Sequence, residues 1–320
     1  MTAVAVASYG DKYLPMLLSF LESWGAVFPK IYLALGDTSE GVTEELAGLY
    51  PRLRIIQPPI SFSRREEIRI SQKMRLWLAL ADHPEVRDHA FTVFADADTI
   101  LVKEIAEFCH GDVVLTLRTP PSQFILNTGV VGLSSKALAA GFVHEWAKRN
   151  EAILGDPAAL AVATSREYPY GGGDQMALVQ MLGLVRSSTA LHFGDLQVRT
   201  VPCAEFNACE NRIDPSKARV IHQKASLHKF LLERRPLMGS RKLQDSLFQL
   251  RAAIEANETA TARMISTGIA PERVDKLYRF RLPRGIRGDL SIPSPIMALH
   301  RSKAAGRRLA GAVLRRAGLR

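Results

Sequence analysis

Apolar segments of strand length alternate with segments of helical periodicity, and this alternation restricts the fold more than any other feature of the chain. Parallel strands cannot be joined by tight turns, so each needs a crossover connection, which is usually a helix. The pattern therefore predicts an α/β fold in which a mixed, mostly parallel sheet is flanked by helices. The strand-like segments are 2–9, 30–37, 53–58, 89–102, 112–118 and 124–134, and the helix-like segments are 13–24, 40–50, 64–82, 136–150 and 174–183.

Positive charge is concentrated at the C-terminal end of the chain. The formal net charge is +10, yet residues 1–230 carry 23 Lys and Arg against 25 Asp and Glu, whereas residues 231–320 carry 19 against 7. Nearly neutral residues 1–230 lack the positive charge that binds the phosphate backbone of a nucleic acid, so we expect no nucleic-acid partner. We place the main domain at 1–230, a helical appendage at 231–278 and a basic tail at 279–320.

The tail is the part of the chain that suits an anionic surface. It contains 11 Lys and Arg and a single acid, Asp289. Each basic residue near an anionic bilayer contributes about 1 kcal/mol, so the tail predicts peripheral attachment to the cytoplasmic face of a membrane. A solvated tail without a partner explains the same residues equally well.

The rest of the sequence carries no sign of a membrane-spanning or secreted protein. No apolar run reaches the about 18 residues that cross a bilayer. Residues 1–10 lack the basic start and long apolar stretch of a secretory signal. Cys109, Cys203 and Cys209 are too few and too scattered for a disulfide framework or a zinc site. We therefore expect a cytoplasmic protein.

Two acids follow a buried strand pattern in the segment Phe94-Ala95-Asp96-Ala97-Asp98-Thr99. Side chains at i and i+2 of a strand share a face, so the Asp96 and Asp98 carboxylates are expected side by side. Their repulsion is relieved by a hard divalent cation, Mg²⁺ or Mn²⁺, which in such sites commonly bridges to phosphates. Ligands of open α/β sheets bind beyond the carboxyl ends of the strands, where these acids are expected. Aspartate at a strand-to-turn junction also occurs without a metal.

The same residues are compatible with a second reaction, phosphate-ester hydrolysis. A strand followed by Asp-x-Asp-x-Thr resembles the first motif of haloacid-dehalogenase-type phosphatases, in which Asp96 would be the nucleophile. That family also needs a later acidic pair, and Gly173-Asp174 is followed by Gln175 and apolar residues. We keep this phosphatase as an alternative.

Three further motifs place polar residues at the borders of apolar segments. Asn127-Thr128-Gly129 interrupts a strand pattern, a glycine run leads into Asp174-Gln175, and His222 ends a late strand-like run. Each has a plain structural explanation: an edge-strand asparagine, a helix N-cap aspartate and a hydrogen-bonded core histidine.

Together and in this order, the motifs resemble those of GT-A-fold (Rossmann-like) glycosyltransferases, and most of all the family 8 group or a neighbouring nucleotide-diphospho-sugar transferase family. The resemblance covers 1–230 and implies a metal-dependent hexosyltransferase. Such an enzyme moves a sugar from a nucleotide sugar, here a UDP-sugar, to a hydroxyl of a saccharide or lipid-linked acceptor, with retention. A role in cell-surface polysaccharide or lipopolysaccharide synthesis follows from the same resemblance. A nucleotide-sugar-binding protein without turnover is the non-enzymatic alternative.

The resemblance also implies a role for each matching residue. Asp96, Asp98 and His222 would ligate Mn²⁺ or Mg²⁺. The residues implied to line the donor-sugar pocket and to be catalytic are Asn127, Asp174 and Gln175. Because an amide is a poor nucleophile, Gln175 favours front-face attack by the acceptor hydroxyl.

Nucleotide and diphosphate contacts are implied along the first strand, the helix before the acids and the late basic segment. The usual late motif of the family contains Gly, Pro and Trp, which the sequence HQKASLHK over 222–229 lacks. The residues implied in these contacts are Ala7, Ser8, Tyr9, Lys73, Arg75, Asp96, Ala97, Lys224 and Lys229.

Overall fold

The computed structural model describes most of the main domain. The described residues are 2–10, 13–25, 27–38, 41–63, 65, 68, 71–101, 103–118, 124–165, 167–184, 191–209 and 217–222. The predicted helical appendage, the basic tail, Lys224 and Lys229 lie outside the described residues.

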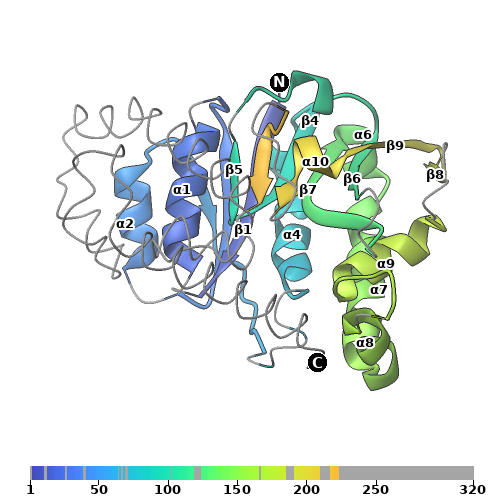
Figure 1. Cartoon of the computed structure of the whole chain (residues 1–320). Coiled ribbons are helices and arrows are strands. Elements are labelled where there is room, and N and C mark those ends of the chain that lie inside the picture. The colour runs from blue at the N-terminus through green and yellow to red at the C-terminus, as the bar shows by residue number, and fades with distance from the viewer. Residues whose placement is uncertain are drawn as a thin grey trace, which may run out of the picture.

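An eight-stranded sheet forms the centre of the molecule (Figure 1). Its strands lie in the order β3-β2-β1-β4-β7-β6-β9-β8, and six of them run in one direction, with β7 and β8 reversed. The predicted mixed, mostly parallel sheet is therefore confirmed. The strands are β1 (Thr2–Tyr9), β2 (Ile31–Gly36), β3 (Leu53–Ile56), β4 (Phe91–Asp96), β6 (Val113–Leu117), β7 (Leu126–Ser134), β8 (Leu191–Phe193) and β9 (Leu196–Pro202).

Helices cover both faces of this sheet, and the side chains of β1 point alternately towards the two layers of helices. Val4 and Val6 pack in one core with α1 (Leu14–Gly25) and α2 (Val42–Leu49). Ala3, Ala5 and Ala7 belong to the opposite core with α4 (Lys73–Asp82), α7 (Phe142–Gly155) and α9 (Gly173–Leu182). Successive strand side chains point to opposite faces, so a strand buried on both sides is apolar throughout.

The helical connections differ in detail from the predicted segments. The helix predicted over 136–150 is divided into α6 (Ser135–Ala139) and α7 at Gly141, whose φ of 74° suits glycine. The helix predicted over 64–82 is described as α4 from Lys73 onward. The remaining short helices are α5 (Pro84–Arg87), η2 (Ala106–Phe108), α8 (Pro157–Thr164) and α10 (Cys203–Phe206).

A second, three-stranded sheet places residues 220–222 next to the segment that contains Asp96 and Asp98. β5 (Thr99–Leu101) pairs antiparallel with β11 (Val220–His222), which pairs parallel with β10 (Ala208–Cys209). In this register His222 lies opposite Thr99. None of the described helices has the length and apolarity needed to cross a membrane.

Candidate active site

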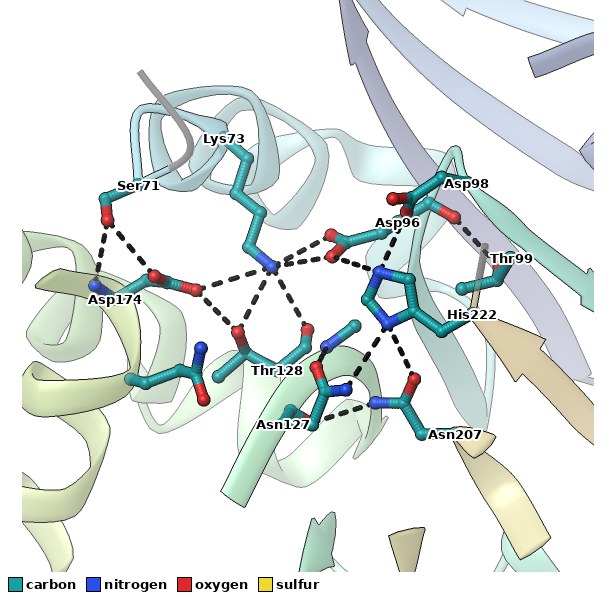
Figure 2. A network of polar contacts seen from close by, with 12 residues as sticks. Ser71, Lys73, Asp96, Asp98, Thr99, Asn127, Thr128, Asp174, Asn207 and His222 are labelled. Atoms are coloured by element: carbon teal, nitrogen blue, oxygen red, sulfur yellow. Dashed lines mark hydrogen bonds and ion pairs between the residues drawn. The ribbon is translucent and has the colours of Figure 1, made fainter. Parts of the chain in front are cut away.

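Polar side chains from β4, β7, β11, α4 and α9 meet at one edge of the main sheet (Figure 2). Asp96 ends β4, and His222 ends β11. Because β7 is antiparallel to β4, its first residues, Asn127 and Thr128, lie at the edge where β4 ends. Asp174 lies in the first turn of α9. The edge is the ligand-binding edge expected for an open α/β sheet.

Asp96, Asp98 and His222 form a cluster of potential metal ligands. One ligand atom from each lies within 4.8 Å of the others. His222 Nε2 lies 3.0 Å from Asp98 Oδ1 and 3.7 Å from Asp96 Oδ2. The two acids do not share a strand face as the i, i+2 pattern predicts, because β4 ends at Asp96 and Asp98 lies in a turn. Thr99 Oγ1 supports this turn by donating to the Asp96 carbonyl at 2.8 Å.

The cluster fits a hard divalent cation. His222 is fully buried, and its Nε2 makes no hydrogen bond within the described part of the chain despite the nearby Asp98 carboxylate. A ring nitrogen and two carboxylates thus lie within 4.8 Å of one another. This donor set could hold Mn²⁺ or Mg²⁺.

Lys73 lies beside the cluster and is surrounded by protein oxygens. Its Nζ donates to Asp96 Oδ1 and Oδ2 at 2.8 and 3.0 Å and to Thr128 O and Oγ1 at 3.2 Å. It also lies 3.4 Å from Asp174 Oδ2. Burial lowers the pKa of Lys73, but the charges of Asp96 and Asp174 raise it by more, so the ammonium stays charged.

Besides its ion pair with Lys73, Asp174 makes hydrogen bonds with the side chains of Ser71, Thr128 and Trp146. Oδ1 accepts from Ser71 Oγ at 3.1 Å, Oδ2 accepts from Thr128 Oγ1 at 2.5 Å, and the backbone carbonyl accepts from Trp146 Nε1 at 2.7 Å. The N-cap position of α9 is Gly172, so the N-cap explanation for Asp174 is wrong.

The glycine run before Asp174 permits close approach. A Cβ on Gly171 would lie 2.8 Å from Gln175 Nε2. A Cβ on Gly172, whose φ is +144°, would lie 3.0 Å from Asp174 Oδ1. The run therefore lets the backbone pack directly against the two polar side chains that follow it.

Asn127 and Gln175 lie in different surroundings. Asn127 is buried, its Oδ1 accepts from Gly129 N at 3.1 Å, and its Nδ2 faces His222 Nδ1 at 3.4 Å. Gln175 Nε2 donates to the Gly171 carbonyl at 3.2 Å, while its Oε1 is buried without a partner among the described residues. Asn127 thus contacts the metal-ligand cluster, whereas Gln175 retains an unused acceptor.

Three residues predicted to contact the nucleotide lie at the end of β1, the strand next to β4. Ala7 of β1 lies opposite Asp96 in the sheet register. The Ser8 hydroxyl is buried and has no hydrogen-bond partner within the described segments. The Tyr9 ring stacks on Phe62, with centroids 5.1 Å apart and planes 3° apart.

Arg75 lies apart from the other predicted contacts. Its guanidinium donates to both carboxylate oxygens of Glu151, at 2.9 and 2.7 Å, and to the Ser61 carbonyl at 3.1 Å. The hydrogen bond with Glu151 raises the pKa of Arg75. Its predicted contact with a diphosphate or sugar stays a prediction.

Sequence patterns did not identify four polar residues that complete the network. Thr128 belongs to the Asn127-Thr128-Gly129 motif, but nothing in the sequence indicates that its hydroxyl or that of Ser71 binds Asp174. Thr116 lies in an otherwise apolar strand, and Asn207 is 91 positions from Thr116 and 80 positions from Asn127, its two acceptors. The four are Ser71, Thr116, Thr128 and Asn207.

Neither a family model nor a curated protein matches this sequence. The solved structure of the glycosyltransferase GlyE from Streptococcus pneumoniae TIGR4 matches with a TM-score of 0.50 and 11% identity, over 81% of this chain and 63% of GlyE. The galactosyltransferase LgtC in complex with donor and acceptor sugar analogs matches with a TM-score of 0.48 and 11% identity, over 86% of this chain and 99% of that one.

A glycosyltransferase involved in the glycosylation of the major capsid of PBCV-1 matches with a TM-score of 0.43 and 11% identity, over 71% of this chain and 96% of that chain. The similarity to GlyE shows the class of fold, which is the GT-A fold of glycosyltransferases. The predicted GT-A fold is confirmed, and this chain spans 63% of the GlyE chain it matches.

Proposed function

We propose that this protein is a metal-dependent glycosyltransferase that moves a sugar from a nucleotide sugar to a hydroxyl acceptor. One observation carries the proposal. Ser8 Oγ, Gln175 Oε1 and His222 Nε2 are buried and lack hydrogen-bond partners within the described residues. Buried polar groups are normally partnered, so unpartnered ones that occur together among the residues of a candidate site support a ligand there. All three belong to the residues that the GT-A resemblance implies in ligand binding.

The proposed metal is Mn²⁺ or Mg²⁺, held by Asp96, Asp98 and His222. The imidazole in the ligand set favours Mn²⁺, because Mg²⁺ prefers oxygen ligands and keeps several waters. When held by these residues, such a cation would supply positive charge that stabilises the leaving nucleoside diphosphate. Lys73 offsets part of the negative charge of the cluster by binding the Asp96 carboxylate.

The side chains around the proposed sugar position favour retention by front-face attack. Asp174 is the acid next to Gln175 in the chain, but its carboxylate is bound by Lys73, Thr128 and Ser71. A carboxylate held in this way is poorly placed to attack an anomeric carbon. The free Gln175 Oε1 accepts a hydrogen bond from a sugar or acceptor hydroxyl and so orients it without itself reacting.

The proposed donor is a UDP-sugar. Ser8 and Tyr9 end β1 next to β4, so a base and ribose bound there would place their phosphates towards the Asp96 cluster. The unpartnered Ser8 hydroxyl is suited to a hydrogen bond with the nucleoside. Lys224 and Lys229 remain predicted phosphate contacts outside the described residues.

The acceptor is proposed to be a saccharide or lipid-linked saccharide of the cell surface. The basic tail would hold the enzyme at an anionic membrane surface, where such an acceptor lies. Co-sedimentation with anionic vesicles separates the alternatives: the full chain should pellet more than a chain ending at residue 278. Equal pelleting would leave the tail without a membrane role.

Two alternatives are tested by the same preparation. A haloacid-dehalogenase-type phosphatase gains no support from the GT-A fold, and both oxygens of Asp96 accept hydrogen bonds from Lys73. A phosphatase would release phosphate from p-nitrophenyl phosphate. A binding protein without turnover would bind UDP-sugars but neither transfer nor hydrolyse them.

Calorimetric titration of UDP into the full chain, first with Mn²⁺ and then with EDTA, tests the proposal. We expect binding that requires Mn²⁺ and is lost in Asp98→Asn. Asp82→Asn is the matched control, because Asp82 pairs with Arg87 at the end of α4 and its side chain is 47% exposed. UDP binding that is unchanged by EDTA or by Asp98→Asn would contradict the metal site.

A further inference from the structure

Asn207 is a buried asparagine whose amide orientation is fixed by its neighbours. It is fully buried between α10 and β10. Its Nδ2 donates to the Asn127 carbonyl at 3.0 Å and to Thr116 Oγ1 at 3.1 Å. Thr116 Oγ1 donates its own hydrogen to the same Asn127 carbonyl, at 2.6 Å, so towards Asn207 it acts as an acceptor. The amide nitrogen faces these two acceptors, so the amide oxygen faces the other way.

That oxygen determines the proton position on His222. Asn207 Oδ1 lies 2.9 Å from His222 Nδ1. An amide oxygen only accepts, so this contact requires a hydrogen on Nδ1. The Asn127 Nδ2 donor lies farther from the same nitrogen, at 3.4 Å, so the 2.9 Å contact with Asn207 decides the tautomer. In a neutral imidazole the other nitrogen, Nε2, is then a bare lone pair. This is the nitrogen that lies 3.0 Å from Asp98 Oδ1 and 3.7 Å from Asp96 Oδ2.

The backbone of β7 leaves the space that this arrangement needs. A Cβ on Gly129 would lie 2.3 Å from both Cε1 and Nδ1 of His222 and 3.0 Å from Asn207 Oδ1. Gly129 also donates its N–H to Asn127 Oδ1 at 3.1 Å. Asn127 and Gly129 of this motif thus lie against the imidazole, and Figure 2 shows Asn127 beside His222.

We propose that Asn207 is a positioning residue that fixes the Nδ1–H tautomer and the ring orientation of His222, so that Nε2 is presented to the divalent cation. The inference rests on the proposed function for the identity of its target, a metal bound by Asp96, Asp98 and His222. Histidine ligands in metal sites usually donate their second ring N–H to a fixed acceptor, and loss of that acceptor typically weakens metal binding about 10- to 100-fold.

Two substitutions separate positioning from structural support. Asn207→Leu and Asn207→Asp both lose the amide donors to Asn127 and Thr116, but only Asn207→Asp keeps an acceptor opposite His222 Nδ1. We expect Asn207→Leu to bind Mn²⁺ about 10- to 100-fold more weakly than the unaltered chain, and Asn207→Asp to stay within a few-fold of it. Thr116→Val, which removes one anchor and leaves the acceptor, should also stay within a few-fold.

The readouts are Mn²⁺ binding without nucleotide, followed by electron paramagnetic resonance of the free ion, and long-range ¹H–¹⁵N spectra of the metal-free protein at alkaline pH, so that neutral imidazole rings are observed. The spectra report the tautomer directly, and His222→Gln assigns the signal among the eight histidines. We expect the Nδ1–H form in the unaltered chain and in Asn207→Asp, and a different or mixed form in Asn207→Leu.

Equal Mn²⁺ affinity and equal tautomer in Asn207→Leu and Asn207→Asp would overturn the inference. Equal loss of Mn²⁺ binding in both variants would also overturn it, because the role of Asn207 would then be structural. If the unaltered chain binds no Mn²⁺, the proposed function fails and the metal part of the inference fails with it. The tautomer spectra then still decide whether Asn207 orients His222.

Discussion

Lys73 donates to both carboxylate oxygens of Asp96, at 2.8 and 3.0 Å, from a position where its side chain is only 7% exposed. The same ammonium lies 3.4 Å from Asp174. Lys73 therefore joins the proposed metal-binding side of the site to the proposed sugar-binding side. A rigid connection of this kind holds both carboxylates in place before any ligand arrives.

Removal of the Lys73 charge should destabilise the fold. Lys73→Met leaves the carboxylates of Asp96 and Asp174 without their cation, and breaking a buried pair in this way costs about 3–5 kcal/mol. We expect a loss of that order in the free energy of unfolding, measured by urea denaturation at neutral pH. Lys136→Met is the control, because Lys136 pairs with Asp112 with 57% of its side chain exposed. Its cost should stay below about 1 kcal/mol. Equal costs for the two variants would contradict the buried pairing.

The contribution of Lys73 to stability should decline at alkaline pH. The pKa of Lys73 in the folded protein lies above its usual value of 10.5, because the attraction of Asp96 and Asp174 exceeds the effect of burial. The folded state then holds this proton more tightly than the unfolded state. The stabilisation is complete below the unfolded pKa and is lost as pH rises through the folded pKa.

The measurement for this prediction is the difference in unfolding free energy between the unaltered chain and Lys73→Met. We expect a constant difference from about pH 7 to about pH 9 and a shrinking one above the unfolded pKa. The subtraction removes the titration of other groups. A difference that grows with pH would mean that the ammonium is not stabilised by its neighbours.

The sequence sufficed to predict the fold class because the sheet is built from locally readable segments. Alternating small and branched residues in β1 report a strand buried on both faces, whatever lies elsewhere in the chain. The end of β4 at Asp96 could not be predicted, because the segment 89–102 is apolar on both sides of Asp96 and Asp98. What ends β4 is the pairing of β5 with β11, whose residues are more than a hundred positions later.

Residues of the site could be predicted from the sequence only where their type is unusual in its local context. Asp96, Asp98 and His222 are polar groups at the ends of apolar segments, and the structure brings them together. Asn207 and Ser71 gave no signal, since each depends on partners far away in sequence. Lys73 and Arg75 are about 200° apart around a helix, so they must face different surroundings. Only tertiary structure shows that Lys73 contacts the acids and that Arg75 pairs with Glu151.

Gly129→Ala should disturb the site through a single added methyl group. The new Cβ would lie 2.3 Å from two atoms of the His222 ring, so the ring must move. Overpacking of this kind typically costs about 1–3 kcal/mol, and displacement of Nε2 should weaken Mn²⁺ binding. Gly48→Ala is the control, since nothing lies within 4 Å of its Cβ position inside α2. It should stabilise the protein by about 0.4–1 kcal/mol and leave Mn²⁺ binding unchanged. Mn²⁺ affinity that survives Gly129→Ala would place the metal elsewhere.

Gln175→Ala should separate binding from turnover. The Gln175 Oε1 atom is buried and unpartnered, so its proposed role is to orient a hydroxyl of the bound sugars rather than to hold the nucleotide. Removing a group that acts on the reacting centre typically lowers kcat about 10²-fold or more. We therefore expect Gln175→Ala to bind UDP with Mn²⁺ as the unaltered chain does and to turn over a UDP-sugar about 10²-fold more slowly. Gln180→Ala, on the exposed side of the same helix, should change neither quantity. A parallel loss of UDP affinity in Gln175→Ala would instead make Gln175 a nucleotide-binding residue, and unchanged turnover would remove it from the reaction.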